Sequence, residues 1–361
     1  MPIRSFLLLT TSLLIGWPVA LLSAQPDSTR QQAGTAALFG SQTPITFTLM
    51  TRMTALVNDR TKPLADSLAG RHPATLTYLD SVQGASVSVP VAVMVRGNFR
   101  RNATNCAFPP LYLDFPKKKV KNTLFAGQNK LKLVTHCQGD DYVLREFLIY
   151  KLYNLLTPLS FRTRLARVAY VDSLEKRPTE TRWGFLIEAD DAVIRRSQLT
   201  EIGKGLPSTD IDSVSMVRLA VFEFMIGNID WSVSYRHNIR LAKSGTDGKP
   251  LVIPYDFDHA GLVDAPYAQY ADRSGEEGLP TRAYRGPLYP GWLLKRVFAE
   301  FVTLKPQFYA LYQTEKRLTR GYITQSITYL DGFYQIIGDP NAVRANFFNG
   351  DANGKLFRSF N

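Results

Sequence analysis

Four polar side chains that are able to bind a cation fall within one short, otherwise apolar region. Asp230 and Asn238 lie in "GNIDWSVSYRHNIRL", and Asp256 and Asp258 lie in "IPYDFDHAG". A carboxylate that follows a buried strand is costly unless it is paired or bound to a metal. Asp256 and Asp258 stand two apart in an extended segment, so both point to the same side and can address one cation. Oxygen ligands with an added Asn suit Mg²⁺ or Mn²⁺.

These residue types match the needs of phosphoryl transfer. That chemistry uses a metal held by Asp and Asn, and a second Asp that orients or deprotonates the attacking hydroxyl. The competing interpretation is structural: Asp256 and Asp258 cap a turn and pair with surplus arginine. His237 and His259 each adjoin a candidate ligand, and they permit a third interpretation, a metal-dependent hydrolase. Two dispersed histidines favour that reading least.

The elements that must position these residues follow from the periodicity of the chain. Residues 43–190 contain short runs with strand-like alternation, among them "ITFTLM", "VSVPVAVMVRG" and "KLKLVTHC". One segment, "DDYVLREFLIYKLYNLL", has helical spacing instead. Residues 191–361 are mostly helical, with a hairpin formed by "HNIRLAK" and "PLVIPYDFD" and a long polar loop over 264–287. The pattern predicts an α+β protein with a strand-rich N-terminal half that contains one helix and a helical C-terminal half, and with a ligand site between them.

The N-terminus is typical of an exported protein. Residues 1–24 hold a basic start, an uncharged apolar core and a small-residue cleavage site, which predicts a signal peptide. Residues 25–42 are polar and are expected to be disordered. No later segment is apolar enough to span a membrane, so we expect a secreted or periplasmic (cell-envelope) protein. Cys106 and Cys137 are the two cysteines, and an even count in an exported chain favours a disulfide.

The basic composition narrows the classes of partner. The formal net charge is +12, and removal of the signal peptide lowers it to +11 because Arg4 is lost. Such charge attracts anions, including phosphates, acidic polymers and membrane surfaces. The sequence has no zinc-binding spacing, no RNA-binding signature and no basic helix with residues that could read bases. Nucleic acid is therefore not expected as a partner. No Gly-x-Ser-x-Gly motif is present, so a serine hydrolase is not supported.

Several motifs resemble a known family. "GNIDWSVSYRHNIRL" followed by "VIPYDFDHAG" resembles the core of the CotH-type atypical kinases and, more distantly, of the HipA toxin kinases. "VMVRGNFRR", "LREFLIYKLYN" and "WGFLIEADD" are similar to upstream elements of that family in the same order, over about residues 90–262. The resemblance implies an atypical protein-kinase-like two-lobed fold. It also implies an exported phosphotransferase that binds ATP and Mg²⁺ or Mn²⁺ and modifies a protein or another hydroxyl acceptor.

The resemblance also implies a role for individual residues. Asp230 would be the catalytic Asp, Asn238 and Asp256 metal ligands, and Asp258 an auxiliary ligand; Arg96 and Gly97 would lie near the phosphates, Glu146 would orient a basic residue, and Glu188 would lie at the adenine-side hinge. The family's Lys on the next strand is absent, and Lys132 is the candidate to replace it. The Asp230-to-Asn238 spacing is longer than in a kinase catalytic loop. The alternative function is therefore an inactive, kinase-shaped binding protein, with Arg96, Glu146 and Glu188 in structural roles.

Overall fold

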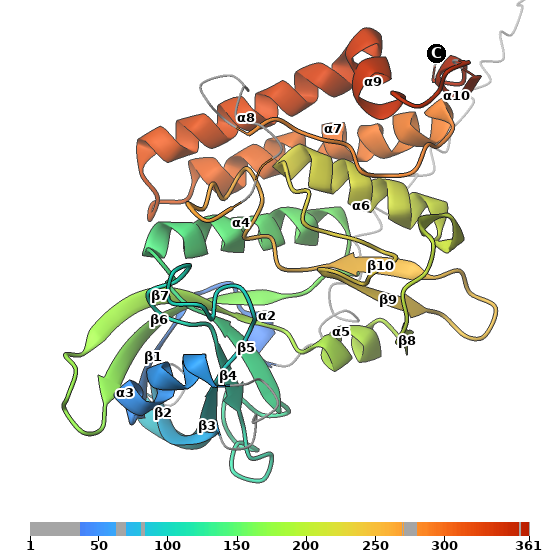
Figure 1. Ribbon diagram of the computed structural model, residues 1–361. Helices are drawn as coiled ribbons and strands as arrows, with labels where there is room; N and C mark the ends of the chain where they lie inside the picture. Colours follow the sequence, from blue (N-terminus) through green and yellow to red (C-terminus); the bar gives the residue numbers. More distant parts are fainter. Residues whose placement is uncertain are drawn as a thin grey trace, which may run out of the picture. The chain divides into compact units, whose positions relative to one another are not determined.

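The computed structural model describes residues 37–62, 70–80, 84–268, 270, 280–353 and 355–360 (Figure 1). The chain divides into Met1–Gly34 and Thr35–Asn361, and every described residue falls in the second unit. The predicted signal peptide and part of the predicted 264–287 loop lie outside the described residues. Among the described residues, no helix is long and apolar enough to cross a membrane.

The strands of the N-terminal part form a closed barrel. Their order around it is β1-β2-β3-β4-β5-β7-β6, and β1 closes it by pairing in parallel with β6. All other pairs in the barrel are antiparallel. The strands are β1 (Ile45–Thr51), β2 (His72–Asp80), β3 (Ala85–Val95), β4 (Leu111–Asp114), β5 (Lys130–Val134), β6 (Thr163–Asp172) and β7 (Glu180–Ile187).

The expected two-lobed, atypical protein-kinase-like fold is wrong. The closed seven-stranded barrel overturns it, and the C-terminal part holds a three-stranded sheet, β10-β9-β8, beside its helices. The periodicity of the sequence predicted strands in this part and the helix over 140–156. It did not predict that the barrel closes, because closure depends on the pairing of Ile45–Thr51 with Ala166–Asp172, segments more than a hundred residues apart. Closing the barrel leaves no exposed edge at β1 or β6.

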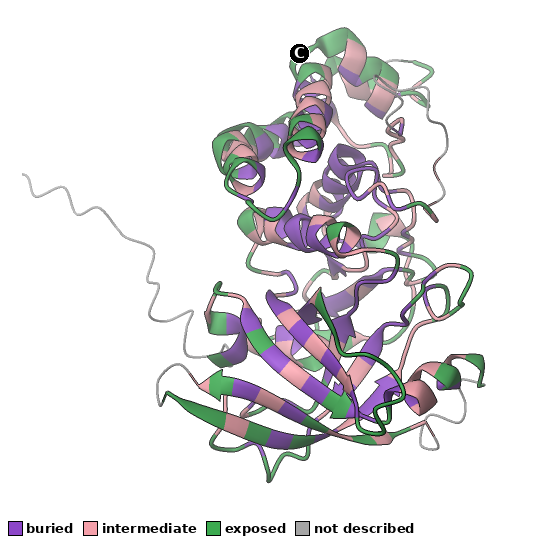
Figure 2. Cartoon of the chain, turned by 90° about the vertical axis from the view of Figure 1, so that its left-hand side faces the viewer, coloured by how far each residue is buried: buried purple, intermediate pink, exposed green. Residues whose placement is uncertain are grey.

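Alternation along the strands fills the barrel with apolar side chains. In β1 the buried positions are Ile45, Phe47, Leu49 and Thr51, and the residues between them are exposed or half-buried. Figure 2 shows buried residues interspersed with exposed or half-buried ones along the barrel strands, and the alternation is regular in β4 and in the second half of β6. The period of two places every second residue on the inner face. The short helix α2 (Ala37–Gly40), in a segment predicted to be disordered, adds buried Leu38 and Phe39 to this core.

Helix α4 (Asp140–Leu156) joins the barrel to the helices. It contacts β6 and β7 on one side and α7 on the other, as Figure 1 shows. Phe147, Leu148, Tyr150 and Leu152 are all buried, although they lie on different faces of the helix. Neighbouring elements cover most of the middle of the helix, so its polar residue Glu146 also lies inside the protein.

The C-terminal part positions the polar residues of the hairpin. Helix α6 (Ser213–Ile226) ends at Gly227, which has a left-handed backbone (φ 69°) and caps the helix. The hairpin strands β9 (Ile239–Lys243) and β10 (Leu251–Pro254) then follow. The remaining elements are α3 (Met53–Asn58), η1 (Asp59–Thr61), α5 (Asp190–Arg196), β8 (Thr200–Ile202), η3 (Ser208–Asp210), α7 (Gly291–Gln313), α8 (Arg320–Gly338), α9 (Pro340–Phe347) and α10 (Lys355–Arg358).

The predicted disulfide between Cys106 and Cys137 is confirmed, and it is consistent with an oxidising compartment outside the cytoplasm. Both cysteines are buried. The bridge closes a loop of about 30 residues, which the chain-entropy model values at about 3–4 kcal/mol. We expect the double variant C106A/C137A to lose about that much free energy of unfolding in urea titrations. A loss below about 1 kcal/mol would contradict a structural role for the bridge.

Candidate functional site

One cavity of about 360 Å³ brings together most of the predicted site residues. It is lined by residues from the ends of β3, β4, β5 and β7, from α4, and from both sides of the β9–β10 hairpin. Seven of the nine predicted catalytic, metal and nucleotide residues line it: Arg96, Gly97, Lys132, Asp230, Asn238, Asp256 and Asp258. Glu146 and Glu188 do not line the cavity, but Glu146 pairs with Arg100, which does. Seven residues singled out in the sequence thus lie around one cavity.

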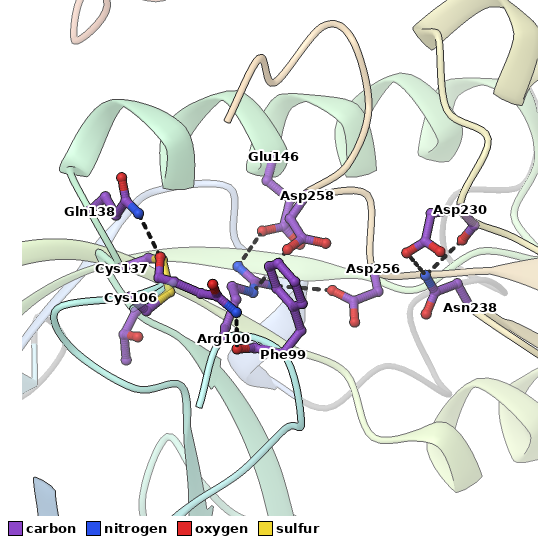
Figure 3. A network of polar contacts seen from close by, with 12 residues as sticks. Phe99, Arg100, Cys106, Cys137, Gln138, Glu146, Asp230, Asn238, Asp256 and Asp258 are labelled. Carbon is purple, nitrogen blue, oxygen red and sulfur yellow. Dashed lines mark hydrogen bonds and ion pairs between the residues drawn. A yellow bond between two sulfur atoms is a disulfide. The ribbon is translucent and has the colours of Figure 1, made fainter. Parts of the chain in front are cut away.

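Arg100 is the centre of an ion-pair cluster at one end of the cavity (Figure 3). Its side chain is only 8% exposed, and its three nitrogens reach three carboxylates. The Nη1–Oε2 distance to Glu146 is 3.0 Å, the Nη2–Oδ1 distance to Asp256 is 3.0 Å, and the Nε–Oδ2 distance to Asp258 is 3.2 Å. The interpretation that Asp256 and Asp258 pair with arginine is thus realised in the structure.

Three acids around one guanidinium leave negative charge in excess. Burial raises the pKa of Glu146 to about 7, although Arg100 opposes the shift. Burial also raises the pKa of Asp258, again against the opposing effect of Arg100. The pKa of Asp256 is lowered instead: burial would raise it, but Arg100, Arg96 and Lys132 together outweigh that effect. Asp256 is therefore the member of the cluster that carries its charge most readily.

The four predicted cation-binding residues differ in the oxygens they have available. Asp258 is buried, and it also accepts a hydrogen bond from Tyr267. Asp256 is 36% exposed, and only its Oδ1 is bonded to Arg100. Within the described ranges, no three His, Cys, Asp or Glu side chains are grouped so as to hold a metal ion. A cation at this site would need oxygens from Asn238, from Asp256 and from a bound ligand. The carboxylate of Asp258 faces Arg100 instead.

Asp230 and Asn238 are held together, and Figure 3 shows Asp256 between them and Arg100. The Asn238 Nδ2 donates to Asp230 Oδ2 at 3.0 Å and to its backbone oxygen at 2.8 Å. The His237 Nε2 lies 2.8 Å from Asp230 Oδ1, and the Asp230 side chain is 36% exposed. Because the amide nitrogen of Asn238 is used in this way, its oxygen Oδ1 is left for a ligand.

The backbone around these residues is locally strained. Arg236, Asn238 and Asp256 have φ values of 50°, 54° and 64°. Such left-handed conformations are uncommon outside glycine, although Asn and Asp adopt them more readily than other residues. Strained residues of this kind cluster at functional sites. Two of the three are residues that the sequence motifs singled out.

Basic side chains line the barrel side of the cavity. Lys132 on β5 is bonded through Nζ to Asp190 Oδ1 at 2.9 Å, and Asp190 also pairs with Arg240. Burial lowers the pKa of Lys132, with Asp190 opposing the shift. Arg96 lies near the ring of Tyr112, and in the described part of the chain its guanidinium forms no hydrogen bond or ion pair. Among the described residues Arg96 therefore has no direct ion pair, although its charge contributes to the lowered pKa of Asp256.

Glu188 occupies a structural position away from the cavity. It forms an ion pair with Arg196 at 2.8 Å and accepts a hydrogen bond from the Arg162 backbone N–H. Both partners fix the connection between β7 and α5. The structural interpretation of Glu188 therefore describes its contacts, and nothing in the described residues places it against a nucleotide.

Sequence reasoning missed three contributors to the site. Arg100 belongs to the motif "VMVRGNFRR", but no ion-pair role was predicted for it, and Asp190 and Arg240 were not singled out. Their roles depend on contacts between segments that lie 46 to 158 residues apart, and no local spacing reports such contacts. The chain matches no known family model and no curated protein. The resemblance to the CotH-type kinases therefore stays a prediction.

Proposed function

We propose that this cavity binds the triphosphate of ATP together with Mg²⁺ or Mn²⁺, and that the protein transfers a phosphoryl group to a hydroxyl acceptor. One observation carries the proposal. A single cavity holds Arg96, which has no direct ion pair among the described residues, and the half-buried Lys132 on its barrel side, and Asp230, Asn238 and Asp256 on its hairpin side. This is the division of charge that phosphoryl transfer needs, with cations for the phosphates and oxygen ligands for a metal.

The barrel side supports the phosphate-binding part of the proposal. Arg96 forms no direct ion pair with a described residue, and arginine binds phosphate oxygens in a bidentate manner. The positive charge of Arg96 contributes to the lowered pKa of Lys132. Asp190 divides its carboxylate between Lys132 and Arg240, so these two cations share one negative charge. A phosphate group would complete their neutralisation.

The hairpin side supports the metal-binding part. Asn238 Oδ1 and Asp256 Oδ2 have no hydrogen bond or ion pair to another described residue, and both are hard oxygen donors of the kind that Mg²⁺ prefers. Two protein ligands suffice for Mg²⁺, which completes its shell with water and substrate phosphates. When bound, the metal would neutralise charge that develops on the phosphates.

Asp230 is placed to accept a proton. Its carboxylate is exposed to the cavity and is oriented by His237 and Asn238, so it is held in one conformation. A general base must lie within hydrogen-bond reach of the attacking hydroxyl, and an oriented, accessible carboxylate meets that need. In this proposal the acceptor hydroxyl enters beside Asp230 and His237.

One observation favours a second candidate function, a cell-envelope binding protein without catalytic activity. Arg100 forms ion pairs with Asp256 Oδ1 and with Asp258, so a metal would have to share the Asp256 carboxylate with this arginine. In that case the cavity would bind a phosphate-bearing ligand and release it unchanged. The two candidates differ in turnover and not in binding. The disulfide and the predicted signal peptide suit either one in an exported protein.

The binding step is tested by the Arg96→Met variant. We expect ATP with Mg²⁺ to raise the Tm of the wild-type protein, and we expect Arg96→Met to weaken ATP binding by about 10- to 100-fold, because charge-assisted hydrogen bonds contribute about 1.5–3 kcal/mol. Arg195→Met is the matched control, because its exposed pair with Asp191 lies on α5 outside the cavity. A wild-type Tm that does not respond to ATP and Mg²⁺ would refute nucleotide binding.

A further inference from the structure

Glu223 is a buried acid that has no cationic partner among the described residues. It lies in the last turn of α6, and it is 1% exposed. The other buried acids near the cavity pair with arginine, as Glu146 and Asp258 do. The one side-chain hydrogen bond of Glu223 is to Asn228, whose Nδ2 donates to Oε2 at 2.9 Å. A buried carboxyl without a counter-ion is costly when ionised, and burial accordingly raises the pKa of Glu223 to about 8.

Asn228 connects this acid to the candidate general base. It is 2% exposed. Its Oδ1 accepts a hydrogen bond from the Asp230 backbone N–H at 3.0 Å, while its own N–H donates to the Glu223 backbone oxygen at 2.8 Å. The nitrogen and the oxygen of the Asn228 side chain thus both take part in connecting the end of α6 to Asp230. Buried hydrogen bonds of this kind restrain the groups that they join.

The turn between them permits little movement. Gly227 has a left-handed backbone, and a Cβ at this position would collide with the hydroxyl of Tyr329. Its backbone oxygen accepts a hydrogen bond from the Gly261 N–H at 3.0 Å, which ties the turn to the segment after Asp258. Asn228 thus restrains the backbone at Asp230, and Glu223 restrains the side-chain nitrogen of Asn228.

We propose that Glu223 is a positioning residue that acts through Asn228 to hold Asp230 in the geometry needed for proton transfer. The inference rests on the proposed function, since it assigns a support to the residue proposed as the base. Glu223 does not line the cavity and contacts neither Arg96 nor Lys132. It should therefore affect turnover without affecting how tightly ATP binds.

The test compares Glu223→Met, which removes the hydrogen-bond acceptor, with Glu223→Gln, whose side-chain oxygen still accepts from Asn228. We expect Glu223→Met to lower kcat roughly 100-fold, because a misplacement of about 1 Å costs that much, and to leave KM for ATP within about threefold. Glu223→Gln should recover most of kcat. Arg218→Met is the matched control on α6, because the Arg218–Glu300 pair is remote from Asp230 in the hydrogen-bond network.

A double-mutant cycle tests the route through Asn228. If Glu223 acts through Asn228, the double variant E223M/N228A should lose no more kcat than N228A alone, because effects of residues that act as a unit are not additive. Losses that multiply, or a Glu223→Met variant with unchanged kcat, would overturn the inference.

Amide hydrogen exchange at Asp230 gives a readout that needs no turnover. The Asp230 N–H should be protected in the wild type and in Glu223→Gln, and it should exchange at least tenfold faster in Glu223→Met. Equal protection in all three proteins would overturn the positioning role. A wild type with a protected amide but no ATP turnover would instead refute the proposed function and leave the positioning role intact.

Discussion

Arg100→Met is expected to lower the free energy of unfolding by about 3–5 kcal/mol, the cost of removing one partner from a buried ion pair. The side chain balances three carboxylates, and two of them, Glu146 and Asp258, are almost fully buried. Methionine matches the length of the arginine stem but supplies no charge, so the acids must ionise without a partner or bind protons. Urea unfolding at pH 7 measures the loss.

The pH dependence of this loss follows from the direction of the pKa shifts. Folding raises the pKa of Glu146 from 4.5 to about 7, so the folded protein binds a proton more tightly than the unfolded chain does within that window. The free energy of unfolding therefore falls as the pH rises from 4.5 to 7. Without Arg100 the acids are harder to ionise, so the destabilisation should be larger at pH 8 than at pH 5.

A matched variant separates charge from packing. Glu146→Gln removes one of the excess acids but keeps an oxygen for Arg100, so it should flatten the fall in stability between pH 4.5 and 7. A loss below about 1 kcal/mol for Arg100→Met, or one that does not depend on pH, would contradict the cluster as described.

The candidate site could be predicted from the sequence where its parts are close in the chain. Asp230, Asn238 and Asp256 are brought together by one helix end and one hairpin, and the periodicity of "SVSMVRLAVFEFMIGN" and "PLVIPYDFD" predicts both. Residue type then indicates the chemistry, because apolar segments rarely hold several carboxylates unless each has a partner.

The rest of the fold and of the candidate site depended on contacts between segments that are distant in the sequence. The barrel closes through a parallel pairing of β1 with β6, and alternation in either strand is equally compatible with an open sheet. Arg100 joins residues of α4 and of the hairpin, so its partners are set by the fold and not by its neighbours. For Glu188, the resemblance implied a position at the adenine-side hinge, and in the structure its carboxylate pairs with Arg196 eight residues later.

Asp230→Asn is expected to lower phosphoryl transfer by about 10²–10⁴-fold, the usual contribution of general-base catalysis. The amide has nearly the same shape as the carboxylate but cannot accept a proton at neutral pH. ATP binding should change little, because Arg96 and Lys132 are untouched. Release of phosphate from ATP, with and without added hydroxyl acceptors, measures the effect.

Asp247→Asn makes the same chemical change on the exposed turn between β9 and β10 and is the control. It should behave as the wild type. If Asp230→Asn keeps more than a tenth of the wild-type rate, Asp230 is not the base. If ATP binds but even the wild type releases no phosphate, the non-catalytic binding protein is the better account.

The central claim is that one cavity holds a triphosphate on its barrel side and a divalent ion on its hairpin side. A crystal structure of the protein with Mn²⁺ and a non-hydrolysable ATP analogue tests this directly, because manganese gives an anomalous signal. We predict one manganese peak within bonding distance of Asn238 Oδ1 and Asp256 Oδ2, with phosphate oxygens on Arg96 and Lys132. Manganese and nucleotide bound elsewhere would contradict the account. So would a cavity that holds no nucleotide at a saturating nucleotide concentration, with Arg100 still paired to its three acids.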